Sequence, residues 1–586
     1  MQDIFDKLYE KSCNGYKFSD LMNTISSKAN ILLAYRNIKN NRGSNTKGTD
    51  GRTISHYKEW KETNFIQYFQ DKLENYHPKS VRRVNIPKPN GKTRPLGIPC
   101  MDDRIIQQCI KQVLEPICEA KFHKHSYGFR PNRATSHALA RMYNLMKQSR
   151  LHYVVDIDIK GFFDNVQHGK LMKQLWHIGI QDKNLLSVMS KILKSEIEGE
   201  GIPTKGVPQG GVISPLLSNV VLNELDWWLS DQWETLETRH TYATGHKFRA
   251  LKTTNLKEFF FVRYADDFKI LCRDHKTAQK MLVATKDWLK ERLGLDISPE
   301  KSQITNLRKR KAEFLGFEIY VKKKRNEYVT QSNIISKAVK TMTDKLRDQI
   351  KVIQHNPVHR EAIKLNAKIL GFHHYYKLAT NASFTFHQID YIVRKSLENR
   401  LKHTLTTKKK RSRSYLRIYG KYKTGKVYTV ASVVLFPIYG CTFTAPMNFK
   451  PEINNYTEQG RKLIYDKLSS ASDYFPYLLN SKNTNYPVEY LDNRISLMSA
   501  QNGKCFITKQ PLMIGNMDCH HKKPKHLGGT DEYKNLVWLS TPVHKLIHAT
   551  RKETIDKYLQ MLKLNDEQLE KVNSLRLLTE NLEIVI

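Results

Sequence analysis

The chain has 586 residues, too many for one hydrophobic core, so we expect about three to five domains. Hydrophobic residues make up 40% and aromatic residues 10% of the chain, which excludes a largely disordered protein. Lysine and arginine outnumber aspartate and glutamate by 97 to 57, a formal net charge of +40 that indicates a polyanionic partner: nucleic acid, or as the alternative an anionic membrane surface.

Targeting signals and cysteine spacing predict where the protein works. No run of about eighteen apolar residues occurs, so no membrane span is expected. The N-terminal residues are of mixed charge and predict no secretory signal. The eight cysteines form no CxxC pair, which indicates a reducing compartment. We expect a cytoplasmic, nucleoid-associated location in a bacterium, with an organelle left open.

Two segments near the N-terminus predict local structure. Residues 42–51, RGSNTKGTDG, are rich in small and polar residues and predict a tight loop that closes an N-terminal helical segment. VRRVNI (81–86) and TRPLGI (93–98) predict two strands, joined by PKPNG, whose Asn-Gly pair favours a hairpin turn. Residues 104–122 are expected to be helical.

A buried sheet is predicted between residues 151 and 305. LHYVVDIDIKGFFDN (151–165) predicts a buried strand in which Asp156 and Asp158 point to the same side. Residues 281–293 have helical apolar spacing, and the glycine directly after them predicts the helix end. The order strand, helix, hairpin, helix, strand favours an α+β sheet with helices on one face.

Asp266 and Asp267 stand side by side within the apolar run FVRYADDFKI (261–270). Carboxylates repel each other, and strands disfavour aspartate. An isolated pair of this kind would therefore indicate an ordinary polar turn between two strands. The other interpretation is that a cation offsets the repulsion. Mg²⁺ prefers oxygen ligands, and two metal ions about 3.5–4 Å apart can activate a 3′-hydroxyl and stabilise leaving pyrophosphate. That chemistry needs a third carboxylate, and strand periodicity leaves both Asp156 and Asp158 as candidates.

From about residue 330 the pattern changes to helices. Apolar residues recur at helical spacing over 335–353 and again over 389–401. No acidic residue occurs from Asn399 to Pro451, and the basic run within this stretch is interleaved with tyrosines. Basic and aromatic residues together suit phosphate contact and stacking on unpaired bases. A plain solvated surface is the alternative.

Five motifs in chain order resemble the core of reverse transcriptases: DIKGFFDN (158–165), GVPQGGVISPLLSN (206–219), YADD (264–267), LGLDISPEKS (293–302) and FLGF (314–317). Four more resemble the group II intron-encoded members of that family: TKGTDG (46–51), RVNIPKPNGKTRPLGIP (83–99), LEPICEAKFHKHSYGFRPNR (114–133) and GFHHYYKLA (371–379). The likeness covers roughly residues 30–450. It implies that residues 321–445 grip the template–primer duplex and help to fold the intron RNA.

The resemblance assigns roles to single residues. It implies a triad that binds two Mg²⁺ ions, and it selects Asp158 over Asp156. The triad is Asp158, Asp266 and Asp267. It also implies residues around an incoming deoxynucleotide: Lys88 and Arg94 at the triphosphate, Phe163 against a ribose 2′-hydroxyl, Gln209 packed on the nucleotide, and Lys301 assisting pyrophosphate departure. For Lys88 and Arg94 an ordinary solvated hairpin is the alternative.

A histidine-rich module follows at residues 519–548, CHHKKPKHLGGTDEYKNLVWLSTPVHKLIH. His544 and His548 are four residues apart on an expected helix, so both can reach one metal ion. The stretch resembles the ββα-metal HNH endonuclease motif.

The HNH resemblance implies a second catalytic set. His521 would be the general base and Asn535 would orient the water, while His520, His544 and His548 would bind one divalent ion (Mg²⁺, Mn²⁺ or Zn²⁺). Related modules often carry paired CxxC elements for structural zinc. This chain has one cysteine in CFIT (505–508) and Val543 where a second pair would begin, so structural zinc is expected to be absent. The alternative is a folded but inactive remnant.

Together these interpretations predict the fold class and the domain boundaries of the chain. The expected fold is multidomain, with an α+β right-hand polymerase, a helical thumb and a small ββα-metal HNH domain. The expected segments are an N-terminal extension (1–75), fingers and palm (76–320), thumb or maturase domain (321–445), DNA-binding segment (446–495) and HNH domain with helical tail (496–586).

The expected protein binds its intron RNA, assists splicing, nicks target DNA and copies RNA into DNA from deoxynucleotides at the nick. A splicing-only maturase and a defence- or retron-type reverse transcriptase are the alternatives. The expected partners are intron RNA and target DNA, without a membrane. The sequence leaves the oligomeric state open.

Overall fold

The computed structural model describes residues 1–39, 41–87, 91, 93–407, 411–422, 426–465, 478 and 486–585. Packing divides the chain into two compact units. The first comprises Met1–Lys121, His168–Leu217 and Asn454–Ile586, and the second Phe122–Gln167 and Ser218–Ile453. The five segments expected from the sequence divide the chain by function, and their boundaries stay a prediction. Within the described ranges, no helix is long and apolar enough to cross a membrane.

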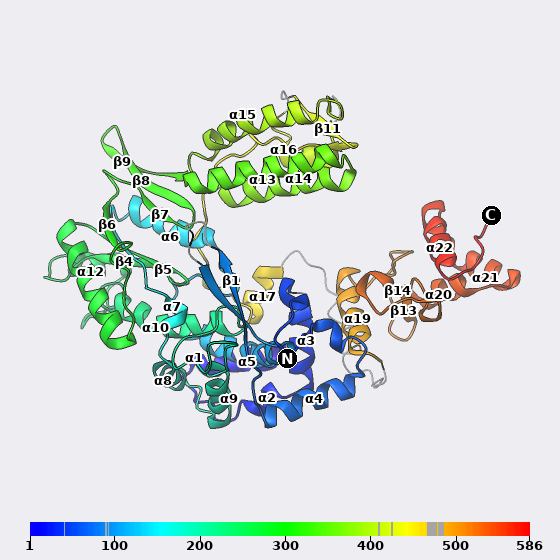
Figure 1. Cartoon of the computed structure of the whole chain (residues 1–586), viewed down its shortest axis with the longest axis horizontal. Helices are drawn as coiled ribbons and strands as arrows, with labels where there is room; N and C mark the ends of the chain where they lie inside the picture. The colour runs from blue at the N-terminus through cyan, green and yellow to red at the C-terminus, as the bar shows by residue number, and fades with distance from the viewer. Residues whose placement is uncertain are drawn as a thin grey trace. The chain divides into compact units, whose positions relative to one another are not determined.

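A four-stranded antiparallel sheet forms the centre of the second unit. Its strands, in spatial order, are β4 (Phe259–Tyr264), β5 (Asp267–Cys272), β3 (Tyr153–Ile157) and β6 (Gln303–Asn306). Val155 of β3 lies opposite Ile270 of β5 and Ile304 of β6, so apolar side chains line up across the sheet. Helix α12 (His275–Trp288) packs on β3, β5 and β6 (Figure 1). The predicted α+β sheet is therefore present, and its helix ends at Gly294 in the left-handed region (φ 69°), as expected.

The other elements of the second unit surround this sheet or follow it. They are α6 (Thr135–Lys147), α7 (Phe162–Asn165), α10 (Ser214–Asp231, which starts in the first unit), α11 (Thr244–Leu251), the π-turn η3 (Leu289–Leu293), β7 (Ala312–Phe314), β8 (Phe317–Lys324), β9 (Glu327–Ile334), α13 (Ser336–His355), α14 (His359–Tyr376), α15 (Ala382–Arg400), β10 (Thr406–Thr407), α16 (Arg413–Tyr419), β11 (Tyr428–Val430) and β12 (Val433–Val434). Strands β7, β8 and β9 form one small sheet, and β10, β11 and β12 form another.

Helix α13 packs against both α14 and α15, and Figure 1 shows the three helices side by side. Both apolar stripes predicted from the sequence lie in the packed interior. Their buried members are Met342, Leu346, Ile350, Ile353, Ile389, Val393, Leu397 and Leu401. The helical pattern predicted after residue 330 is thus confirmed. Burial of one apolar face of each helix stabilises the bundle.

The first unit is mostly helical. Its elements before residue 218 are α1 (Gln2–Cys13), α2 (Met22–Ile25), α3 (Lys28–Lys39), η1 (Arg42–Asn45), η2 (Ile54–Tyr57), α4 (Glu62–Glu74), β1 (Arg82–Pro87), β2 (Thr93–Ile98), α5 (Met101–Glu119), α8 (His168–Ile178) and α9 (Lys183–Leu193). Strands β1 and β2 pair antiparallel, with Ile86 opposite Arg94, which confirms the two predicted strands. Three residues of the predicted turn, 88–90, lie outside the described residues.

The C-terminal part of the first unit contains a ββα arrangement made of β13, β14 and α20. The elements of this part of the chain are α17 (Glu458–Tyr465), α19 (Val488–Ala500), β13 (Met517–His521), η4 (Lys525–Leu527), η5 (Tyr533–Asn535), β14 (Leu536–Ser540), α20 (Thr541–His548), α21 (Lys552–Leu562) and α22 (Asp566–Leu578). Strands β13 and β14 pair antiparallel, and α20 follows β14 directly and packs on both. An apolar core that includes Met498, Trp538 and Leu546 holds α19, β14 and α20 together.

Candidate functional site

The turn between β4 and β5 carries the adjacent aspartates. Ala265 adopts a left-handed conformation (φ 59°), and Asp266 follows it before β5 begins at Asp267. Gly128 lies against this turn, and a Cβ atom on it would come within 2.3 Å of the Ala265 nitrogen. A residue without a side chain is therefore required where the segment around Gly128 meets the turn.

Asp158, Asp266 and Asp267 line one cavity of about 430 Å³ in the second unit. Asp158 directly follows β3, and its carboxylate accepts a hydrogen bond from Lys301 at 3.0 Å. The backbone oxygen of Asp158 accepts another from the Ser298 amide at 2.7 Å. The structure thus brings together the three predicted aspartates and Lys301. Carboxylate oxygens converging on an open cavity are the donor set that Mg²⁺ prefers, so the residues fit the implied metal ions.

Asp156 and Asp158, which strand periodicity could not separate, have different partners. Asp156 accepts a hydrogen bond at 2.5 Å from Lys269 of β5, and the same ammonium group donates to Asp267 at 2.8 Å. Burial raises the pKa of Asp156, and Lys269 opposes that shift. Burial alone would lower the pKa of Lys269, but Asp267 and Asp156 together raise it. Asp156 is therefore engaged in an internal ion pair. Its partner, Lys269, was not among the residues predicted from the sequence.

Arg263, also missed, braces the aspartate turn from within the protein. Its side chain is fully buried, and its Nε and Nη2 donate to Asp226 at 2.7 and 2.5 Å. Its Nη1 donates to Asn219 at 3.0 Å and to the Ala265 carbonyl at 2.8 Å. An arginine in an otherwise apolar strand was the available signal, because a buried charge needs a partner. The planar guanidinium ties β4, α10 and the turn together.

The predicted nucleotide-binding residues belong to both units. Phe163 of α7 is half-buried in the second unit and packs edge-on against Phe162. Arg94 and Gln209 belong to the first unit, where the Gln209 carbonyl accepts a hydrogen bond from Gly97 of β2 at 2.8 Å. Lys88 lies outside the described residues. The joint role of these residues at one nucleotide stays a prediction.

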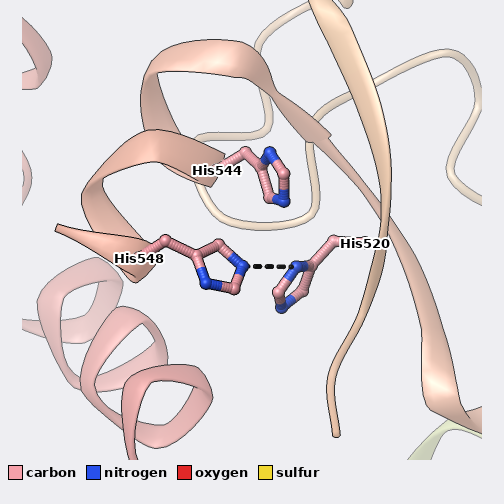
Figure 2. A group of neighbouring side chains, drawn as sticks. All are labelled: His520, His544 and His548. Carbon is pink, nitrogen blue, oxygen red and sulfur yellow. Dashed lines mark hydrogen bonds between the residues drawn. The ribbon is translucent and has the colours of Figure 1, made fainter. Parts of the chain in front are cut away.

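Three histidines meet in the ββα arrangement (Figure 2). His520 comes from β13, and His544 and His548 come from successive turns of α20. One ring nitrogen from each lies within 4.8 Å of the others, and His520 Nδ1 is 3.4 Å from His548 Nε2. Burial and the two neighbouring rings lower the pKa of His520 to about 3. Neutral imidazoles facing one point are suited to a divalent ion.

One further observation fits a metal ion at this cluster, which His520 faces through Nδ1. The other ring nitrogen of His520, Nε2, is buried and has no hydrogen-bond partner among the described residues. Asp518 lies 3.5 Å from His544 Nδ1 and also accepts a hydrogen bond from Thr541 at 2.7 Å. A carboxylate behind a histidine fixes the orientation of the ring toward a metal.

His521 and Asn535 lie beside the cluster, at the two ends of the loop that joins β13 to β14. His521 Nε2 donates to Asp531 at 2.8 Å, and its ring stacks on Tyr490 of α19. The Asn535 amide group donates to the Lys523 and Thr530 carbonyls at 3.0 and 2.8 Å. Asn535 therefore braces the loop that follows His521, and its predicted contact with a water molecule stays a prediction.

The cysteine considered for structural zinc is part of the core. Cys505 is buried, and its Sγ accepts a hydrogen bond from the Ser540 amide at 3.4 Å. Val543 is fully buried in the same apolar cluster. Apolar packing and hydrogen bonds occupy these two positions.

Comparisons with known proteins match two parts of the chain to families. Residues 86–319 match the model of the reverse transcriptase (RNA-dependent DNA polymerase) family, and residues 339–420 match that of the group II intron maturase-specific domain. Protein YkfC of Escherichia coli (strain K12) is 32% identical over 306 residues, which cover 49% of this chain and 79% of YkfC.

Another relative is the group II intron-encoded protein LtrA of Lactococcus lactis subsp. cremoris. It is 31% identical over 430 residues, which cover 61% of this chain and 70% of LtrA. Among solved structures, telomerase from Candida albicans in complex with a fragment of telomeric RNA covers 72% of this chain and 68% of its own, at 14% identity and a TM-score of 0.37.

Proposed function

The chain belongs to the group II intron-encoded proteins, and from its reverse transcriptase and maturase-specific domains we propose two activities. It copies RNA into DNA at the carboxylates of the β4–β5 turn, and it assists the splicing of its own intron RNA. The observation that carries the assignment is the meeting of Asp158, Asp266 and Asp267 at one cavity. Two bound Mg²⁺ ions would supply activation of a primer 3′-hydroxyl and neutralise charge on the leaving pyrophosphate.

The chain's own groups position the reactants of this step. The primer oxygen forms a bond to the α-phosphorus of a deoxynucleotide, the bond to pyrophosphate breaks, and the hydroxyl proton goes to solvent. Lys301, whose ammonium group donates to Asp158, would offer a proton or a charge to the leaving pyrophosphate. Phe163 would exclude a ribose 2′-hydroxyl, while Arg94 and Lys88 would hold the triphosphate.

Primer extension on an RNA template tests the polymerase. Asp266→Ala should abolish synthesis, while binding of the intron RNA measured by filter retention stays unchanged. Asp287→Ala, at an exposed acid of α12, is the matched control and should keep the wild-type rate. Synthesis by Asp266→Ala at the wild-type rate would refute the assignment, and a wild type that splices but does not extend primers would favour a splicing-only maturase.

We further propose that the ββα arrangement nicks target DNA, so that the new 3′ end primes reverse transcription. The His520, His544 and His548 cluster supports a single divalent ion, which would supply stabilisation of the leaving oxygen. His521 would take the proton from a water molecule, whose oxygen forms a bond to phosphorus as the bond to the 3′ oxygen breaks.

The nuclease is tested with the ribonucleoprotein of the full chain and its intron RNA, on duplex DNA that spans the joined flanking exons, with Mg²⁺ or Mn²⁺. His521→Ala should slow nicking about 10²- to 10⁴-fold and leave primer extension unchanged. Asp266→Ala should abolish primer extension and leave nicking unchanged. His526→Ala, at an exposed histidine of the same loop, is the control and should nick normally. If the wild-type particle leaves the DNA intact, the module is an inactive remnant.

A further inference from the structure

Asp531 is a buried carboxylate next to the proposed nuclease base. It lies in the loop between β13 and β14, and only 3% of it is exposed. It accepts hydrogen bonds from His521 Nε2 at 2.8 Å and from Lys525 Nζ at 2.6 Å. Burial of a carboxylate is costly unless cationic or hydrogen-bonding partners compensate for the lost water. Here one of the two partners is the histidine of the proposed reaction.

The contact determines which nitrogen of His521 carries the proton. An ionised carboxylate only accepts hydrogen bonds, so Nε2 must be the protonated nitrogen of the neutral ring. The lone pair that can accept a proton from water is then on Nδ1. The face of the ring is held as well, since it stacks on Tyr490 with centroids 5.4 Å apart and planes 8° from parallel. The ring is therefore restrained by one edge contact and one face contact.

Contacts of the surrounding backbone hold Asp531 in place. The Asp531 carbonyl accepts a hydrogen bond at 2.7 Å from Asn493 of α19, which is itself buried. Two residues earlier, a Cβ on Gly529 would come within 1.8 Å of the Lys523 carbonyl, so the loop closes on itself at a glycine. These two contacts fix the backbone of the loop from which the carboxylate reaches His521.

We propose that Asp531 is the positioning residue of His521, holding Nε2 as a donor so that Nδ1 takes the proton from the attacking water. The proposal rests on the proposed endonuclease function. It goes beyond that function because it assigns an orienting residue and a reacting atom to the base. When the ring takes up the proton, the adjacent carboxylate also stabilises the resulting imidazolium, as an orienting aspartate does in hydrolases with a catalytic histidine.

Asp531→Asn is the informative variant, because it keeps the size of the side chain and removes its charge. Single-turnover nicking by the full ribonucleoprotein should slow about tenfold or more, a part of what general-base catalysis contributes. The affinity for the DNA target and the absorption spectrum of Co²⁺ bound to the His520 cluster should stay unchanged. Glu532→Gln, at the next acid of the loop, is the matched control and should nick at the wild-type rate.

A double-mutant cycle with His521→Ala separates positioning from loop structure. If Asp531 acts through His521, adding Asp531→Asn to His521→Ala costs nothing further. A wild-type nicking rate in Asp531→Asn would overturn the proposal, and so would loss of the Co²⁺ spectrum, because the residue would then be structural. Additive losses in the cycle would overturn it as well. If the wild-type particle nicks no DNA, the endonuclease function fails and the proposal fails with it.

Discussion

The ammonium group of Lys269 lies 2.8 Å from the Asp267 carboxylate, so Asp267 is paired within the protein. The same group pairs with Asp156 at 2.5 Å, and only 4% of the Lys269 side chain is exposed. The positive charge of Lys269 thus offsets part of the repulsion between the carboxylates at the turn without a metal ion. It also distinguishes Asp267 from Asp158, whose lysine partner is largely exposed.

Lys269→Met should destabilise the protein and slow primer extension. Removing one partner of a buried ion pair leaves an uncompensated charge and costs about 3–5 kcal/mol. Differential scanning calorimetry should therefore show a lower unfolding temperature. The double variant Lys269→Met/Asp156→Asn should recover most of that loss, because it removes the charge of Asp156, the more buried of the two carboxylates that lose Lys269. An unchanged unfolding temperature in the single variant would contradict the pairing.

Arg263→Met should be more destabilising at pH 8 than at pH 5. Burial raises the pKa of Asp226, and Arg263 opposes the shift, so loss of the arginine raises that pKa further. An acid with a raised pKa in the folded state takes up a proton as the pH falls, and protonation removes the unpaired buried charge. The deficit in unfolding temperature relative to wild type should therefore shrink on acidification.

The exposed pair of Arg150 and Glu327 provides the control for this experiment. Arg150→Met should cost about 1 kcal/mol or less, with little dependence on pH over the same range. A deficit for Arg263→Met that stays constant between pH 5 and pH 8 would show that Asp226 is not the group responsible. Primer extension should also fall in Arg263→Met, because the Ala265 carbonyl before Asp266 loses its donor.

The core of the sheet was predictable because its signals are local. Strand periodicity alone predicts the buried strand around Val155 from its alternating apolar residues. Antiparallel pairing of that strand with the hairpin that carries Asp266 and Asp267 then predicts the sheet. The i, i+4 spacing of His544 and His548 is likewise a local signal, because one turn of helix places both rings on the same face. The choice of Asp158 over Asp156 came from family resemblance and stays a prediction, because Asp156 lines the same cavity and Lys269 pairs with Asp267 as well as with Asp156.

The missed residues depend on contacts between distant parts of the chain. Lys269 could have been suspected, since a lysine within an apolar strand needs a buried partner, but periodicity does not name Asp156 as that partner. Asp531 is one of several acids near the histidines, and its backbone carbonyl accepts a hydrogen bond from Asn493 of α19, far away in the chain. No local pattern predicts that α19 docks on α3, where the Tyr35 hydroxyl donates to Glu489, 454 residues away in the chain.

Asp518→Asn should weaken metal binding at the histidine cluster. Asp518 faces His544 Nδ1 at 3.5 Å, and loss of such a partner typically lowers metal affinity about 10- to 100-fold. Titration with Co²⁺, followed by its visible absorption, measures the effect without relying on nicking. Asp556→Asn, at an exposed acid of α21, is the control. Equal Co²⁺ affinity in Asp518→Asn and wild type would show that His544 needs no orienting carboxylate.

Lys39→Met should loosen α19 and, through it, slow the proposed nuclease. Lys39 of α3 pairs with Asp492 at 2.5 Å and donates to the Asn493 side-chain oxygen at 2.8 Å. Without it the buried Asp492 carboxylate keeps Arg36, at 2.5 Å, as its one cationic partner among the described residues. Because Asn493 holds the Asp531 backbone, the loop beside the base loses support.

Hydrogen exchange measures this loosening directly. Amides of α19 and of residues 525–535 should exchange faster in Lys39→Met, since local opening becomes less costly. Lys39→Met/Asp492→Asn should restore part of the protection, because it removes the charge of Asp492 but leaves Glu489 without Lys39 and Arg36 without Asp492. Lys7→Met, at an exposed lysine of α1, should leave exchange unchanged. Faster exchange in α19 with unchanged exchange in 525–535 would show that the contact of Asn493 with Asp531 does not transmit the change, and the nicking rate should then equal that of the wild type.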